Sequence, residues 1–333
     1  MVWLNGLRAG VLRVTGALLL GAALASCGGG EQVQKFVPQR ILSFGDENSV
    51  IVDGGDHNGA KYTVNALKDV TAGTLDCKAN PIWNEYLATA YALVFPQCNP
   101  DAVTTTSNIY AAPGALANLA SAPNAGVSDV AAQVDSFIAQ GNSFNGKDLV
   151  TVLAGGNDIY QQYLLIKAGT IDEAQAAATL EQAGSALAAQ VNRIALAGGK
   201  VLISTVPDLG TTPFGVNEDL AVSGRAALLT RLTARLNAKL RIGLINDGHM
   251  IGLILSDESI SSVIKNVSGF VNVKQGVCAV ALPGCKTTSL ITPTDGTTAS
   301  GDTWLWADDL HLSAGGHKII GSLAVTRATG NPF

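Results

Sequence analysis

The sequence contains few charged residues and no run of basic ones. Lys, Arg, Asp and Glu make up 14% of its 333 residues, and the formal net charge is −5. A nucleic-acid-binding surface needs clustered basic side chains, so we expect no nucleic-acid partner. No Gly-x-Gly-x-x-Gly follows a predicted strand, which argues against a dinucleotide site. With 47% hydrophobic residues, the chain can bury a large core.

Histidine is also scarce, and its placement does not fit a metal centre. The four histidines are scattered along the chain: His57, His249, His311 and His317. The histidines and cysteines do not match zinc-ligand spacing, so zinc is the less favoured interpretation. Asp53, Asp56 and Asn58 could hold calcium, but the stretch lacks the closing Glu of an EF-hand, and we predict a hairpin or loop. We expect neither a metal nor a cofactor.

The N-terminus has the features of an export signal. Arg8 and Arg13 form a basic region before an apolar run at 14–25, which is too short to span a bilayer comfortably. The Leu-Ala-Ser-Cys that ends at Cys27 resembles the bacterial lipobox, in which the cysteine is lipidated and becomes the mature N-terminus. We therefore predict a lipoprotein signal peptide over residues 1–26 and lipidation of Cys27. Simple secretion with cleavage nearby is the alternative.

A short tether and then a single domain are predicted after the signal. Three glycines open a flexible segment over residues 27–39, and the domain occupies residues 40–333. Two or more acyl chains on Cys27 would supply about 0.8 kcal/mol per buried methylene, enough for stable anchoring. The predicted location is the bacterial cell envelope, lipid-anchored at the outer membrane, with a periplasmic or secreted protein as the alternative. We expect a monomer.

Four further cysteines lie in the predicted domain: Cys77, Cys98, Cys278 and Cys285. An even number in an exported chain suggests disulfides, and four cysteines allow three connectivities. Each sequence-local pair brackets a loop-rich stretch. We therefore predict the bonds Cys77–Cys98 and Cys278–Cys285.

Short apolar stretches alternate with long helical patterns along the domain. Strands are predicted at 41–44, 148–154, 200–206 and 250–255, and helices at 81–94, 127–140, 171–197, 217–246, 257–265 and 313–329. Strands that alternate with helices predict an α/β fold with helices on both faces of the sheet. The expected architecture is a three-layer α/β/α sandwich with a mainly parallel central sheet.

Glycines and polar residues cluster where predicted strands end. Residues 45–47 (Gly-Asp-Glu) follow the first strand, and residues 155–158 (Gly-Gly-Asn-Asp) follow the second. Gly114 lies in an Ala-Ala-Pro-Gly-Ala loop, and residues 308–311 (Asp-Asp-Leu-His) precede the last helix. Because ligands of open α/β sheets bind outside the carboxyl ends of the strands, we expect these segments to converge on one cleft.

These segments resemble the GDSL-type esterases and lipases of the SGNH hydrolase superfamily. The resemblance covers roughly residues 40–325. The family's Gly-x-Asn-Asp block stands at 155–158 and its Asp-x-x-His block at 308–311, and its strand followed by Pro-Asp-Leu-Gly is similar to 202–210. The resemblance implies an SGNH hydrolase-like sandwich that acts on a small-molecule or lipid ester.

Ester hydrolysis needs a base that takes and returns a proton, and donors aimed at the developing oxyanion. His311 is the candidate base, and Asp308 can accept from its other ring nitrogen. The resemblance implies the same two roles, with Asp309 as the less favoured partner. The Asn157 amide and the Gly114 N–H are candidate oxyanion donors, each worth roughly 3 kcal/mol in the transition state.

Position 47 departs from the family pattern, because the nucleophilic Ser that follows Gly-Asp is Glu47 here. Its carboxyl should be ionised at neutral pH, since the ordinary pKa of Glu is about 4.3. Such a carboxylate favours an imidazolium at His311, and it could also fill the donors of Asn157 and Gly114. Ser49 is the nearest hydroxyl downstream. Its side chain lies two positions further along the chain and should not point in the same direction as that of position 47, so Ser49 is a minority candidate.

Two functions are therefore open at this point. Glu47 could activate a water or attack the ester itself, which would give an ester hydrolase. The alternative is a catalytically silent relative that binds an acyl or carbohydrate ligand, and a purely structural role is a third reading. We favour the hydrolase because the base, its orienting carboxylate and both donors are all present.

Overall fold

The fold is that of a computed structural model, which describes residues 35–122, 126–267 and 269–330. The fold belongs to the compact unit Phe36–Phe333. The predicted signal peptide and Cys27 lie outside the described residues, as does most of the predicted tether. Among the described helices, none combines the length and the apolar character needed to cross a membrane.

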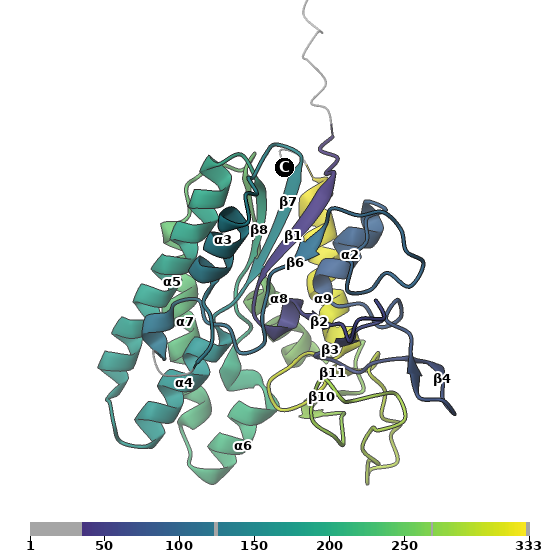
Figure 1. Cartoon of the computed structure of the whole chain (residues 1–333). Helices are drawn as coiled ribbons and strands as arrows, with labels where there is room; N and C mark the ends of the chain where they lie inside the picture. Colours follow the sequence, from purple (N-terminus) through teal and green to yellow (C-terminus); the bar gives the residue numbers. More distant parts are fainter. Residues whose placement is uncertain (1–34, 123–125, 268, 331–333) are drawn as a thin grey trace, which may run out of the picture. The chain divides into compact units, whose positions relative to one another are not determined.

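A five-stranded sheet forms the centre of this unit, with the order β6-β1-β7-β8-β9 (Figure 1). Its strands are β1 (Arg40–Gly45), β6 (Asn108–Ile109), β7 (Asp148–Leu153), β8 (Lys200–Ser204) and β9 (Ile251–Ile254). Every neighbouring pair in this sheet is parallel. The prediction of a parallel central sheet is therefore confirmed.

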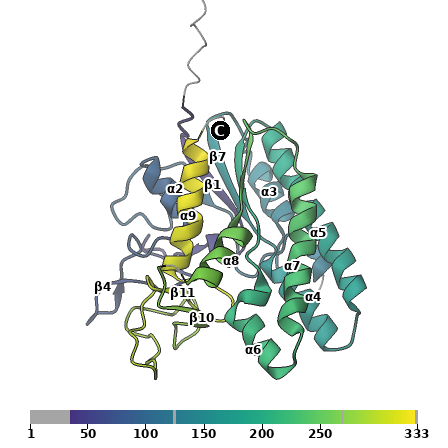
Figure 2. The ribbon, with the colours of Figure 1, turned by 180° about the vertical axis from the view of Figure 1, so that it is seen from behind.

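Helices cover both faces of the sheet (Figures 1 and 2). One face carries α3 (Val130–Ala139), α5 (Glu173–Leu196) and α7 (Arg225–Gly243), and the other carries α2 (Trp83–Ala90), α8 (Ser256–Asn266) and α9 (Ala314–Thr329). Side chains alternate along each strand: in β7, Val150 packs in the core of the first face and Leu149 in that of the second. Burial on both faces completes the three-layer α/β/α sandwich that the sequence predicted.

Shorter elements connect these layers. They are η1 (Glu47–Ser49), β2 (Ile51–Val52), β3 (Ala60–Lys61), β4 (Leu67–Asp69), β5 (Thr74–Leu75), η2 (Leu119–Ser121), α4 (Gly156–Lys167), η3 (Leu209–Thr211), α6 (Pro213–Ala221), β10 (Asn272–Gly276) and β11 (Trp304–Trp306). The antiparallel strands β2 and β3 form a hairpin with the turn 53–59, which is one of the two alternatives predicted for this stretch. Asp53 Oδ1 accepts from the backbone N–H groups of Gly55 and His57, so this carboxylate stabilises the turn.

Three predicted helices differ clearly in extent from the observed ones. The helix predicted at 81–94 is α2, which ends at Ala90. The stretch 217–246 contains two helices, α6 and α7, because Gly224 adopts a left-handed conformation between them with a φ of 96°. The helix predicted at 127–140 begins at Val130, since the Asp129 side chain accepts from the backbone N–H of Ala132 and caps its first turn.

Both predicted disulfides are present. Cys77 is bonded to Cys98 and Cys278 to Cys285, with Cα–Cα distances of 5.7 and 5.8 Å. The first bond brackets α2, and the second closes the loop that follows β10. The local pairing read from the sequence is confirmed.

Strands β1 and β7 pair in register over their whole length, from Arg40 opposite Asp148 to Gly45 opposite Leu153. At the start, Arg40 Nε lies 2.7 Å from Asp148 Oδ1. At the end, Gly45 has a φ of +130°, and a Cβ there would lie 1.9 Å from the carbonyl oxygen of Leu153. Glycine is therefore required where the two strands end side by side, and the segments that follow both strands emerge at the same edge of the sheet.

Candidate active site

Three neighbouring strands deliver three of the predicted site residues to one edge of the sheet. Glu47 follows β1, Asn157 follows β7, and Gly114 follows β6. The segment after β6 stays bound to β1, because the backbone N–H of Ala112 donates to the carbonyl of Gly45 at 3.0 Å. A fourth segment, the turn 308–311 between β11 and α9, brings His311 to the same place.

The Glu47 carboxylate lies at the centre of this site. Its Oε2 accepts from the backbone N–H of Gly114 at 2.8 Å and from Asn157 Nδ2 at 3.0 Å. Its Oε1 lies 3.1 Å from His311 Nε2 and 3.2 Å from Asn157 Nδ2. The residue is only 7% exposed. The two groups predicted as oxyanion donors therefore hold a carboxylate of the chain itself.

The imidazole of His311 lies between two carboxylates. Its Nδ1 is 2.8 Å from Asp308 Oδ2, on the side opposite the contact with Glu47. Asp308 Oδ1 also accepts from the backbone N–H groups of Leu310 and His311, at 2.9 and 2.7 Å, so its own turn holds the carboxylate in place. Asp309 is exposed, and its carbonyl accepts from the backbone N–H of Phe214. The structure places Asp308, rather than Asp309, beside the imidazole.

The two carboxylates decide the charge on the imidazole. Burial opposes the positive charge of His311, but the hydrogen bonds and charges of Asp308 and Glu47 outweigh burial and raise its pKa to about 10. Burial likewise opposes ionisation of Glu47, yet the hydrogen bond and charge of His311 lower the pKa of Glu47. The pKa of Asp308 is lowered, again against burial, by the same imidazolium. At neutral pH the site thus holds two carboxylates and one imidazolium.

Two buried polar residues that the sequence analysis did not single out hold the turn after β1. Gln133 Oε1 accepts from the backbone N–H of Gly45 at 2.7 Å, and its Nε2 donates to the Gly45 carbonyl at 2.8 Å. Asp46 Oδ1 accepts from the backbone and side-chain N–H groups of Asn48 at 3.1 and 2.9 Å. A signal for Gln133 existed, because it is a polar residue among Val130, Val134 and Phe137 on the buried face of α3.

Ser49, the minority candidate for the nucleophile, is fully buried. Its Oγ accepts from Trp83 Nε1 at 3.0 Å, and its carbonyl accepts from Asn84 Nδ2 at 3.1 Å. Both partners belong to α2, so the Ser49 hydroxyl takes part in helix packing while His311 Nε2 contacts Glu47.

Asp158 and His317 lie near the site residues in sequence but have other surroundings. The Asp158 carboxylate accepts from the backbone N–H groups of Ala117 and Asn118 at 2.7 and 3.2 Å, which ties the Gly114 loop to α4. His317 is fully buried in α9, and burial lowers its pKa to about 3. Its burial in α9 makes His317 a packing residue.

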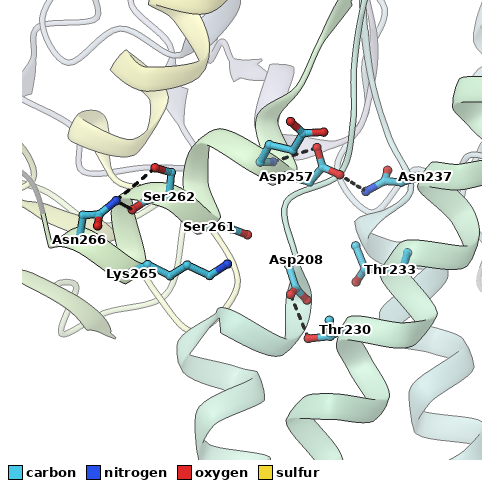
Figure 3. Close-up of a pocket in the computed structure, with 11 residues that line it drawn as sticks. Asp208, Thr230, Thr233, Asn237, Asp257, Ser261, Ser262, Lys265 and Asn266 are labelled. Carbon is cyan, nitrogen blue, oxygen red and sulfur yellow. Dashed lines mark hydrogen bonds between the residues drawn. The ribbon is translucent and has the colours of Figure 1, made fainter.

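A separate cavity of about 500 Å³ lies beyond the ends of β8 and β9 (Figure 3). Most of the residues that line it are polar, and some of them bond one another: Thr230 donates to Asp208 at 2.9 Å and Asn237 to Asp257 at 3.4 Å. None of the residues that contact Glu47 lines it. Over the described ranges, no group of three or more His, Cys, Asp or Glu side chains is arranged to hold a metal ion.

The raised pKa of His311 makes the stability of the fold depend on pH. The folded-state value of about 10 lies above the unfolded value of about 6.5, so its contribution to the free energy of unfolding is complete below pH ~6.5. That contribution is lost as the pH rises toward about 10. We therefore expect the stability difference between wild type and His311→Gln, from urea unfolding at several pH values, to shrink over this interval.

An NMR titration of the His311 imidazole checks the same assignment directly. The midpoint should lie near pH ~10 in the wild type and should fall in Glu47→Gln, because the amide removes one of the two stabilising carboxylates. A wild-type midpoint at or below ~6.5 would contradict the proposed charge state.

Comparison with known proteins gives the wider context. No curated protein matches the chain. Similar solved structures include a lipolytic protein of the G-D-S-L family from Veillonella parvula (13% identity, TM-score 0.38, 86% of this chain and 96% of that chain covered). Others are an extracellular lipase from Streptomyces rimosus (15%, 0.41, 88% and 100%) and an acetylxylan esterase from Geobacillus stearothermophilus (12%, 0.40, 90% and 98%). Scores and identities this low carry no argument about activity.

The match to a protein family is more informative. The family described as GDSL-like Lipase/Acylhydrolase matches residues 41–324, which is most of the chain. The matched range runs from β1 to α9 and includes Glu47, Gly114, Asn157 and His311. Ester hydrolysis is the activity that this match supports. On the strength of it, the chain belongs to the GDSL-like lipase and acylhydrolase family.

Proposed function

We propose that this chain hydrolyses carboxylic esters, either small-molecule or lipid esters, at the bacterial cell envelope, and that Glu47 and His311 share the proton transfers. The observation that carries the proposal is the 3.1 Å contact between Glu47 Oε1 and His311 Nε2. A base and an acid in direct contact can exchange a proton between themselves, so the pair can be reset after each turnover.

The charges assign the two roles. His311 is protonated at neutral pH and acts as the acid, and ionised Glu47 acts as the base. Glu47 takes a proton from a water, whose oxygen forms a bond to the ester carbonyl carbon. His311 gives its Nε2 proton to the leaving alkoxide as the carbon–oxygen bond breaks. Glu47 then returns its proton to His311, which restores the starting charges and leaves one acid and one alcohol.

Direct attack by Glu47 is the less favourable route. It would give a mixed anhydride, which is a costly intermediate compared with an ester. In addition, Glu47 Oε2 already accepts from Gly114 and Asn157, so its lone pairs face these donors rather than an incoming carbonyl carbon. Activation of water uses Oε1, which contacts His311 and Asn157, and it requires only a proton transfer to this oxygen rather than a bond to carbon.

Loss of either member of the pair should abolish most of the hydrolysis. We expect His311→Ala and Glu47→Gln each to lower kcat/KM for 4-nitrophenyl acetate by roughly 10²- to 10⁴-fold, the usual worth of a positioned acid or base. Ser49→Ala is the matched control, and it should keep the wild-type rate because its hydroxyl bonds Trp83. Equal rates for wild type and His311→Ala would refute the proposal, and a loss confined to Ser49→Ala would make that hydroxyl the nucleophile.

A silent, ligand-binding relative is the second candidate. The length of the Glu47 side chain favours it, because this length matches that of an acylated serine. In an acyl-serine intermediate the acyl carbon lies two bonds beyond Cβ, through Oγ. In glutamate the carboxyl carbon also lies two bonds beyond Cβ, through Cγ. Glu47 Oε2 rests on Gly114 N and Asn157 Nδ2, the donors that would hold an acyl-serine carbonyl. The Glu47 side chain therefore resembles an acylated serine that cannot be hydrolysed, and it occupies the site permanently.

Glu47→Ser separates the two candidates. If the wild type is silent, this variant should react with a fluorophosphonate probe and hydrolyse 4-nitrophenyl butyrate faster than wild type, because the donors are freed for the substrate. His311→Ala in the Glu47→Ser background is the control and should remove the labelling. If Glu47→Ser instead loses the wild-type activity, Glu47 is the working base. Labelling of the wild type at Ser49 would overturn the silent reading.

The envelope location rests on residues 1–27, where a basic region and an apolar run precede Cys27. Lipidation of Cys27 with two or more chains would hold the chain stably at a membrane. We expect an alkyne analogue of palmitate to label the wild type in a bacterial host and to leave Cys27→Ser unlabelled. Equal labelling of the two proteins would contradict the anchor.

A further inference from the structure

A buried turn presents one aromatic side chain beside the His311 ring. The turn comprises residues 61–65. Lys61, Thr63 and Val64 are 0% exposed and Asn65 is 3% exposed, whereas Tyr62 is only partly buried. The Tyr62 ring centroid lies 6.2 Å from that of His311, and the two planes are tilted by 47°. The turn thus buries its other side chains and leaves Tyr62 next to the acid of the proposed reaction.

The first residue of the turn is held by an unusually dense set of bonds. The Lys61 ammonium donates to the carbonyls of Cys77, Ala79 and Asn80 at 2.6, 3.0 and 3.0 Å. It also pairs with Glu85 Oε2 at 2.9 Å. A buried ammonium persists only where acceptors replace its water, so this arrangement resists any shift of the turn.

The last residue of the turn is fixed just as firmly. Asn65 Oδ1 accepts from the backbone N–H of Lys61 at 2.8 Å, which closes the turn. Asn65 Nδ2 donates to the carbonyls of Pro283 and Cys285 at 2.9 and 3.0 Å, and the Asn65 backbone N–H donates to Cys285 as well. Both ends of the turn are therefore bonded to disulfide-linked loops, Cys77–Cys98 at one end and Cys278–Cys285 at the other.

We propose that Tyr62 is the substrate-contacting wall of the Glu47–His311 site and that it selects esters with an apolar or aromatic group beside the scissile bond. The inference rests on the proposed function, because it names the substrate class of the same site. The turn that carries Tyr62 is fixed at both ends, and its partly exposed ring lies beside His311, so an ester bound at the Glu47–His311 pair can contact the ring. Aromatic contacts of this kind favour apolar partners. Burial, and then the nearby charge of Glu47, raises the pKa of Tyr62, so its hydroxyl stays neutral.

The test separates binding from hydrolysis. Wild type, Tyr62→Ala and Tyr62→Phe are compared on 4-nitrophenyl butyrate for KM and kcat, and on 4-nitrobutyranilide, its unreactive amide counterpart, for Kd by NMR titration. We expect Tyr62→Ala to raise KM and Kd about threefold to tenfold with little change in kcat, and Tyr62→Phe to stay near wild type, because the ring supplies the contact. Tyr91→Ala is the matched control: it removes a partly buried tyrosine whose hydroxyl bonds the carbonyl of Ala328.

The outcomes distinguish this inference from the proposed function. If the wild type binds the amide but does not hydrolyse the ester, and Tyr62→Ala weakens binding, the hydrolase proposal fails. The proposed contact between Tyr62 and the ligand is then still supported. If Tyr62→Ala changes neither KM nor Kd, or changes them no more than Tyr91→Ala does, the wall is refuted. A wild type that binds neither compound also refutes it, because Tyr62 then selects no ligand of this class.

Discussion

The in-register pairing of β1 with β7 decides where the site residues lie. The two strands begin together at the Arg40–Asp148 ion pair and end together at Gly45 and Leu153. At that end the absence of a Cβ at position 45 lets the backbones approach, and Gln133 then bonds both the N–H and the carbonyl of Gly45. A slip by one residue would reverse the two faces of the strand and remove Glu47 from Asn157.

The second constraint is electrostatic. A carboxylate at 7% exposure is tolerated because three groups replace its water: a backbone N–H, an amide and an imidazolium. The imidazolium is in turn stabilised by Asp308 on its other side. Each member of the set therefore depends on the others, and replacement of any one leaves a charge or donor with no compensation in the interior.

Local patterns predicted much of this architecture. The parallel sheet followed from apolar strands that alternate with helices, and the disulfides followed from loop-rich stretches between neighbouring cysteines. The choice of Asp308 over Asp309 follows from the resemblance to the family's Asp-x-x-His block, and the contact with His311 agrees with it. Convergence of the segments at 47, 114, 157 and 311 was an inference from strand-end geometry, and the described contacts agree with it.

Long-range features could not be predicted in the same way. The sequence predicts that a carboxylate at position 47 could occupy the donors of Asn157 and Gly114, and the contacts agree with this. It does not reveal that the Ser49 hydroxyl bonds Trp83, because that depends on side-chain directions in a tight 3₁₀ turn. Tyr62 reaches His311 across 249 sequence positions (311 − 62), and Gln133 reaches Gly45 across 88. Neither pairing is visible in a local pattern, because each contact joins residues that only the folded chain brings together.

The hydrogen bonds of Lys61 and Asn65 link the state of the two disulfide bonds to ligand binding beside Tyr62. The turn that carries Tyr62 depends on the carbonyls of Cys77 and Cys285, so opening either cystine loosens it. By thermodynamic reciprocity, a molecule that binds only the ordered turn must make both cystines harder to reduce. Ligand binding beside Tyr62 and resistance of the two cystines to reductants are therefore coupled through one equilibrium.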